Sequence, residues 1–193
     1  MKTTATHWVV RSLVIAAAAL LAACGDDAPV GLDRSLTPPS VSAARAPDLG
    51  NCSKLAAPAD TKLAYHVYAK GVQIYRWTGT SWGLYGPAAL LSSDAAGNSV
   101  VGTHYEGPTW ETRSGSRVVG SVLDRCTADP NAAAWLLLAA VPDEGKGPGV
   151  FHGVTRIQRV NTVGGVAPST PGAFVGDEAR VPYTTEYFFY RPK

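Results

Sequence analysis

Residues 62–85 read KLAYHVYAKGVQIYRWTGTSWGLY, and apolar side chains alternate with smaller or polar ones over the first half of this segment. That period of two is typical of a strand with one buried face. We expect a hairpin turn at 69–71, and a second turn at 78–81 that places Trp77 opposite Trp82. A cross-strand aromatic pair of this kind stabilises a hairpin by about 0.2 to 1 kcal/mol.

Strand patterns continue along the rest of the chain, separated by turns rich in glycine and proline. We expect further strands at 99–105, 109–113, 117–123, 150–160 and 179–190. The most apolar segment, 132–141, fits either a short buried helix or a strand covered on both faces, and we favour the strand. Strands without intervening helices pair mainly antiparallel. The sequence therefore predicts a mainly β fold, a single antiparallel β-sandwich or barrel-like domain with short strands and Gly/Pro-rich loops.

The N-terminal residues carry the signature of bacterial export with lipid attachment. Positive charges at Lys2 and Arg11 precede an apolar run, which ends in Leu-Ala-Ala directly before Cys24. The run is too short for the roughly 20 apolar residues of a membrane-spanning helix. We therefore expect a lipoprotein signal peptide at 1–23, lipidation of Cys24, and attachment to the bacterial cell envelope with the domain facing the periplasm or the exterior.

The next segment, 24–58, is rich in proline, alanine and serine and has no periodic apolar pattern. We interpret it as a flexible tether that joins the lipid to a β-rich domain at 59–193. With Cys24 lipidated, Cys52 and Cys126 remain as a pair in an oxidising compartment, so we expect a disulfide between them. It would close a loop of about 75 residues and stabilise the fold by roughly 4 kcal/mol.

Charge and histidine spacing restrict the classes of partner. The formal net charge is +2, and two of the positive residues belong to the predicted signal. Without clustered Lys and Arg, a nucleic-acid partner is not expected. No two histidines of the mature chain have the spacing of a local zinc site, although distant strands can still assemble a metal site. The glycine-rich stretch 145–149 lacks the spacing of the P-loop and of the dinucleotide fingerprint. We predict no metal and no cofactor.

The candidate ligand-binding residues are His104, Tyr105, Glu106 and Trp110. Residues two apart on a strand share a face, which favours His104 beside Glu106. An imidazole next to a carboxylate suits acid–base chemistry, and an indole beside both suits stacking on a sugar or another planar molecule. Glu111 is a second carboxylate candidate, but its distance from Glu106 across the intervening Gly-Pro is undetermined.

Four segments of the domain stand out in order: GVQIYRW at 71–77, GTHYEGPTWE at 102–111, IQRVNTVGG at 157–165, and VPY at 181–183 followed by YFFY at 187–190. Together these segments resemble an exported and uncharacterised family labelled DUF3455. The resemblance implies an exported protein with a single β-rich domain. It supplies no activity, and therefore no catalytic residue.

Two function hypotheses follow. The first is a membrane-anchored, ligand-binding or envelope-structural β domain that takes a glycan or small molecule, with no catalysis. The alternative is an exported hydrolase acting on carbohydrate through His104 with Glu106 or Glu111. A deep cleft that gathers these side chains would favour the enzyme, and a flat aromatic face over a filled interior would favour binding.

Overall fold

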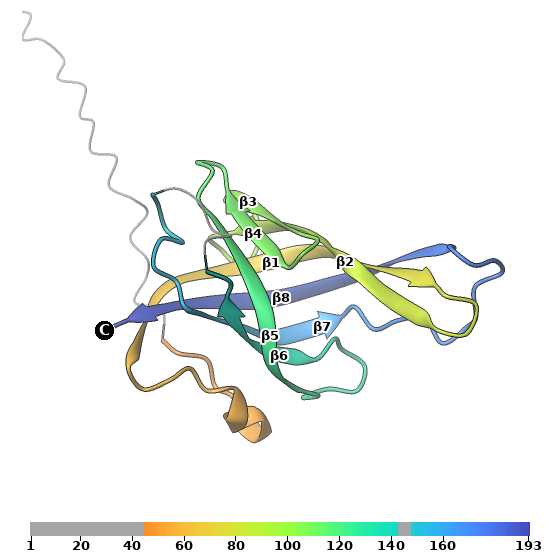
Figure 1. Ribbon diagram of the computed structural model, residues 1–193, viewed down its shortest axis with the longest axis horizontal. Helices are drawn as coiled ribbons and strands as arrows, with labels where there is room; N and C mark the ends of the chain where they lie inside the picture. The colour runs from red at the N-terminus through yellow and green to blue at the C-terminus, as the bar shows by residue number, and fades with distance from the viewer. Residues whose placement is uncertain (1–44, 143–147) are drawn as a thin grey trace, which may run out of the picture. The chain divides into compact units, whose positions relative to one another are not determined.

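Eight antiparallel strands form a closed barrel in the computed structural model, which describes residues 45–142 and 148–193 (Figure 1). Each strand pairs with its neighbours in sequence, and the ring closes between the first and the last. A short 3₁₀ helix, η1, precedes them. The elements are η1 (Gly50–Leu55), β1 (Thr61–Trp77), β2 (Trp82–Ser92), β3 (Val100–Tyr105), β4 (Thr109–Thr112), β5 (Arg117–Cys126), β6 (Trp135–Ala140), β7 (Arg156–Gly164) and β8 (Glu178–Pro192).

The mainly β, antiparallel prediction is confirmed, and of the two architectures the chain adopts the barrel. The long strands β1 and β8 pair from Thr61 opposite Pro192 to Arg76 opposite Glu178, and β1 also pairs with β2. Closure satisfies the backbone groups that an open sheet would leave unpaired at its edges. The expected strand at 132–141 is present as β6.

The hairpin turn expected at 69–71 is wrong, because β1 runs through it without a break. Gly71 serves a different purpose there. A Cβ at this position would lie 2.1 Å from the Ala88 carbonyl oxygen, so only glycine lets β2 approach so closely. The turn at 78–81 is confirmed, with Trp77 opposite Trp82 and their ring centroids 5.4 Å apart.

The strand expected at 150–160 begins later than predicted, because β7 starts at Arg156. The preceding residues form turns that insert Phe151 into one end of the barrel. Phe151 is 3 % exposed and its ring lies 4.7 Å from that of Phe189 and 5.7 Å from that of Tyr65. Its backbone N–H donates to Ser116 Oγ. The apolar residues before Arg156 therefore do not extend β7, and Phe151 fills one end of the barrel interior.

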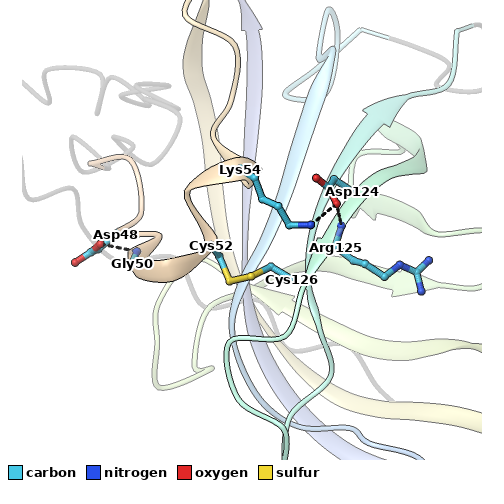
Figure 2. Close-up of a disulfide and its surroundings, with 7 residues drawn as sticks. All are labelled: Asp48, Gly50, Cys52, Lys54, Asp124, Arg125 and Cys126. Atoms are coloured by element: carbon cyan, nitrogen blue, oxygen red, sulfur yellow. Dashed lines mark hydrogen bonds and ion pairs between the residues drawn. A yellow bond between two sulfur atoms is a disulfide. The ribbon is translucent and has the colours of Figure 1, made fainter.

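The predicted disulfide is confirmed: Cys52 and Cys126 are bonded, and the bond joins η1 to β5 on the outside of the barrel (Figure 2). Beside it, Lys54 Nζ lies 2.8 Å from Asp124 Oδ1. Leu55 is fully buried, and its carbonyl oxygen accepts a hydrogen bond from Gln158 Nε2 at 2.6 Å. Residues 50–55, which the sequence assigns to the tether, thus pack on the barrel wall. The predicted signal peptide, Cys24 and the tether up to residue 44 lie outside the described residues.

Candidate functional site

A cavity of about 430 Å³ occupies the end of the barrel opposite Phe151. The β1–β2, β3–β4, β5–β6 and β7–β8 connections surround this end, and the first and last of them lie side by side, with Trp82 Nε1 donating to the Thr170 carbonyl (Figure 1). Exposed residues at the rim, among them Arg125 and Leu84, show that the cavity reaches solvent. Its volume lies within the range of pockets for small organic molecules.

The wall of the cavity is predominantly apolar. Its apolar side chains come from β2, β5, β6 and the β7–β8 connection, and they include Leu84, Pro87, Val122, Leu136, Leu138 and Val166. A wall of this kind favours the apolar body of a ligand, since burial contributes about 25 cal/mol for each Å² of apolar surface removed from water.

Three stacked rings form one side of the cavity. The β3–β4 register places His104 opposite Trp110, and their rings stack at 4.4 Å with an interplanar angle of 9°. Tyr187 of β8 meets both rings edge-on, at 5.0 and 5.1 Å. Gly120 of β5 leaves room for the indole, because a Cβ there would lie 2.9 Å from Trp110 Cζ3.

His104 is buried and uncharged. Its Nδ1 lies 2.8 Å from the Thr109 carbonyl oxygen, which requires the hydrogen to be on Nδ1. Burial lowers the pKa of His104 to about 3, while the hydrogen bond to Thr109 opposes the shift and the positive charge of Arg159 adds to it. The imidazole is therefore neutral at physiological pH and is a weak base.

The structure divides the four predicted ligand-binding residues between the two faces of the wall. His104 and Trp110 are 2 % and 1 % exposed and line the cavity. Tyr105 alternates with His104 and points outward, where its hydroxyl donates to Glu111 Oε2 at 2.6 Å. Glu106 is exposed in the β3–β4 turn. Tyr105 and Glu106 therefore do not line the cavity with His104 and Trp110, and ligand binding by the four residues stays a prediction.

Sequence reasoning did not select Gln73, Arg159 or Tyr187 as ligand-binding candidates, yet all three line the cavity. The alternation of side chains between the two faces of a strand is the signal that identifies Gln73 and Arg159. Gln73 lies two residues from Gly71 and four from Ala69 on the inner face of β1, and Arg159 is two residues from the buried Ile157 on β7. A polar residue on an otherwise apolar face marks a polar group turned into the interior.

Several polar atoms of this region are buried without a partner among the residues that the structure describes. They are Gln73 Nε2, Trp110 Nε1, and the hydroxyl groups of Tyr183 and Tyr187. Burial raises the pKa of both tyrosines, so their hydroxyls keep their protons and can donate, and the two hydroxyls lie close enough for each to affect the pKa of the other. Since buried polar groups are ordinarily hydrogen-bonded, a cluster of unpaired donors beside a cavity indicates a place for an acceptor.

Arg159 carries a positive charge into the same cavity. Its Nε and Nη2 donate to the Ala134 carbonyl oxygen at 3.1 and 2.7 Å. The ion pairs found within 45–142 and 148–193 do not include Arg159. The residues that line the cavity contribute two guanidinium groups, Arg125 and Arg159, and no carboxylate.

In the described part of the chain, no group of three or more His, Cys, Asp or Glu is arranged to hold a metal ion. Nor does that part contain a helix of the length and apolar character needed to span a bilayer.

Comparison with known proteins places the chain in a family. The family model described as "Protein of unknown function (DUF3455)" matches residues 58–191, which include β1 to β7 and all of β8 but its last residue. No curated protein and no solved structure matches the chain. The match covers most of the sequence, so the chain belongs to the DUF3455 family.

Proposed function

We propose that this protein is a binding protein that holds a small organic molecule in the open end of its barrel. The observation that supports the proposal is the cavity of about 430 Å³, which combines an apolar wall with unpaired hydrogen-bond donors. A barrel that served only as a structural element would fill its interior, because interiors are close-packed and unpaired buried donors destabilise the fold.

The hydrolase alternative has less support. Glu111 accepts a hydrogen bond from Tyr105 on the outer face of the barrel. In the β3–β4 register, Glu111 lies opposite Thr103 and not opposite His104. The pKa of His104 is held at about 3 by burial, which makes the imidazole a poor general base near neutral pH. The cavity thus lacks the histidine–carboxylate pair that the enzyme hypothesis needs.

Binding is tested with N-phenyl-1-naphthylamine, an uncharged apolar dye whose fluorescence rises when it leaves water. The suitable protein is the chain from residue 25 to 193, exported behind a cleavable signal that leaves no lipid. It retains both bonded cysteines and all eight strands, so the barrel closes within it. We expect saturable binding of one dye molecule per chain.

A matched pair of variants locates the dye. Val166 lines the cavity and is 40 % exposed at its rim, so V166W is expected to fill the opening and to weaken binding at least tenfold. Val163 is 67 % exposed and does not line the cavity, so V163W is expected to bind as the unmodified chain does. Absence of saturable binding, or equal effects of the two substitutions, would contradict the proposal.

We further propose that the full-length protein is attached to the bacterial envelope through lipid on Cys24. The support is the sequence alone: the positive N-terminal residues, the apolar run, and Leu-Ala-Ala before the cysteine. Metabolic labelling with a radioactive fatty acid tests it. Label is expected on the unmodified protein and not on C24S, and an unlabelled wild-type protein would overturn this part of the proposal.

A further inference from the structure

The polar atoms without partners around the cavity share one property: they can donate hydrogen bonds. Gln73 Nε2 and Trp110 Nε1 are each buried without a partner among the described residues, and the buried Tyr187 hydroxyl lies near enough to Tyr183 and Arg159 for both to lower its pKa. All three residues line the cavity. Gln73, Trp110 and Tyr187 are each 1 % exposed. A ligand with acceptor oxygens would supply partners for these donors.

Arg159 gives the same place a net positive charge. Its Nε and Nη2 donate to the Ala134 carbonyl, and the guanidinium also lies close enough to the Tyr187 hydroxyl to lower its pKa. The guanidinium lies near the Tyr75 and Tyr187 hydroxyl groups. Its positive charge lowers the pKa of each tyrosine, although burial raises both pKa values by more. A partly buried cation without a carboxylate partner favours an anion in the adjoining space.

The strand register brings these groups together. Arg159 lies opposite Tyr187 on β8 and opposite Leu136 on β6, so its side chain extends along the inner wall between a donor and an apolar surface. The Gln73 side chain approaches from β1, where it lies close to the backbone of Gly165: a Cβ at Gly165 would be 3.1 Å from Gln73 Cγ.

We infer that the ligand is an amphipathic organic acid, whose carboxylate is bound by Arg159 together with Gln73 and Tyr187 and whose apolar body lies against the cavity wall. The inference deepens the proposed function and rests on it. A guanidinium presents its donors in a plane that matches the two oxygens of a carboxylate, and a charge-assisted bond is stronger than one between neutral groups. The apolar wall then distinguishes an organic acid from a small inorganic anion.

The experiment compares dodecanoate with 1-dodecanol, two chains of equal length that differ in the charge of the head group. Each displaces N-phenyl-1-naphthylamine from the chain of residues 25–193, at a pH at which dodecanoate is ionised. We expect dodecanoate to bind at least tenfold more tightly than dodecanol. Inorganic phosphate alone is expected to leave the dye bound at concentrations a hundredfold above those of dodecanoate.

Two arginine substitutions on β7 separate the role of Arg159 from a general effect of charge. R159Q is expected to lower the affinity for dodecanoate to that for dodecanol, and R159K to restore part of the difference. Arg156 lies on the same strand, bonds to the Thr155 carbonyl and does not line the cavity, so R156Q is expected to keep the full preference. Thermal melts establish that each variant is folded.

The outcomes keep the two proposals distinct. Equal binding of dodecanoate and dodecanol to the unmodified chain overturns the inference even if R159Q does not fold, and leaves the binding function standing if the dye is displaced by both. The same loss of preference in R156Q and R159Q also overturns it. If the dye itself does not bind, the proposed function fails.

Discussion

Removal of the disulfide gives the largest stability change that follows directly from the geometry. Cys52 and Cys126 are 74 residues apart, and for a loop of that size the chain-entropy relation gives about 4.5 kcal/mol of stabilisation through restriction of the unfolded chain. For a domain of this size, each 1 kcal/mol shifts the melting temperature by about 2–4 °C, so the expected fall is about 9–18 °C. The double variant C52A/C126A suits the test, because Cys52 is 1 % exposed and serine would add a buried hydroxyl.

The assay is urea denaturation of the chain of residues 25–193, followed by tryptophan fluorescence. K54Q is the control: it removes the neighbouring pair of Lys54 with Asp124, whose side chains are 55 % and 41 % exposed, and exposed pairs contribute about 0–1 kcal/mol. A loss below about 1 kcal/mol in C52A/C126A would refute the reasoning. It would mean that η1 and the buried Leu55 hold this part of the chain to the barrel without the covalent link.

Two further predictions concern the aromatic stack. G120A is expected to destabilise the fold by about 1–3 kcal/mol, since the new methyl group would lie 2.9 Å from Trp110 and 3.1 Å from Leu138. Urea denaturation measures the loss, and a neutral effect would show that the indole has room to shift. The second prediction is a pH dependence: because the pKa of His104 is about 3 in the folded chain and near 6.5 when exposed, the unfolded state takes up the proton first. The free energy of unfolding should therefore fall by several kcal/mol as pH drops from about 6.5 toward 3, and His104 should not change it above pH 6.5. In H104N, whose amide can still donate to Thr109, denaturation curves at successive pH values should show a weaker dependence of stability on pH. An unchanged dependence in H104N would contradict the assignment of the effect to His104.

The fold was predictable where a local pattern had only one physical solution. The alternating segments gave most of the strands, and the turn between Trp77 and Trp82 followed from its residues. Closure into a barrel was not predictable, because it depends on the pairing of β1 with β8, more than a hundred residues apart in the chain. The break expected at Gly71 failed because a glycine in a strand marks a close backbone approach as readily as a turn.

The site was only partly predictable for a related reason. His104 and Trp110 were selected as chemically interesting residues, and the register places them in one stack. Their grouping with Tyr105 failed because adjacent residues of a strand face opposite sides. Alternation along the strands places Gln73 and Arg159 on inner strand faces, but only the closed barrel shows that the two residues line one cavity, because their strands lie far apart in the sequence.

The central claim is that an organic anion is held inside the barrel, and a crystal structure of the chain of residues 25–193 grown with dodecanoate tests it most directly. The account predicts density for the acid within the cavity, with the carboxylate at hydrogen-bond distance from the Arg159 guanidinium and the alkyl chain along Leu136 and Val166. An empty cavity in crystals whose protein has been saturated with dodecanoate in solution, or an acid bound with its carboxylate away from Arg159, would contradict the account.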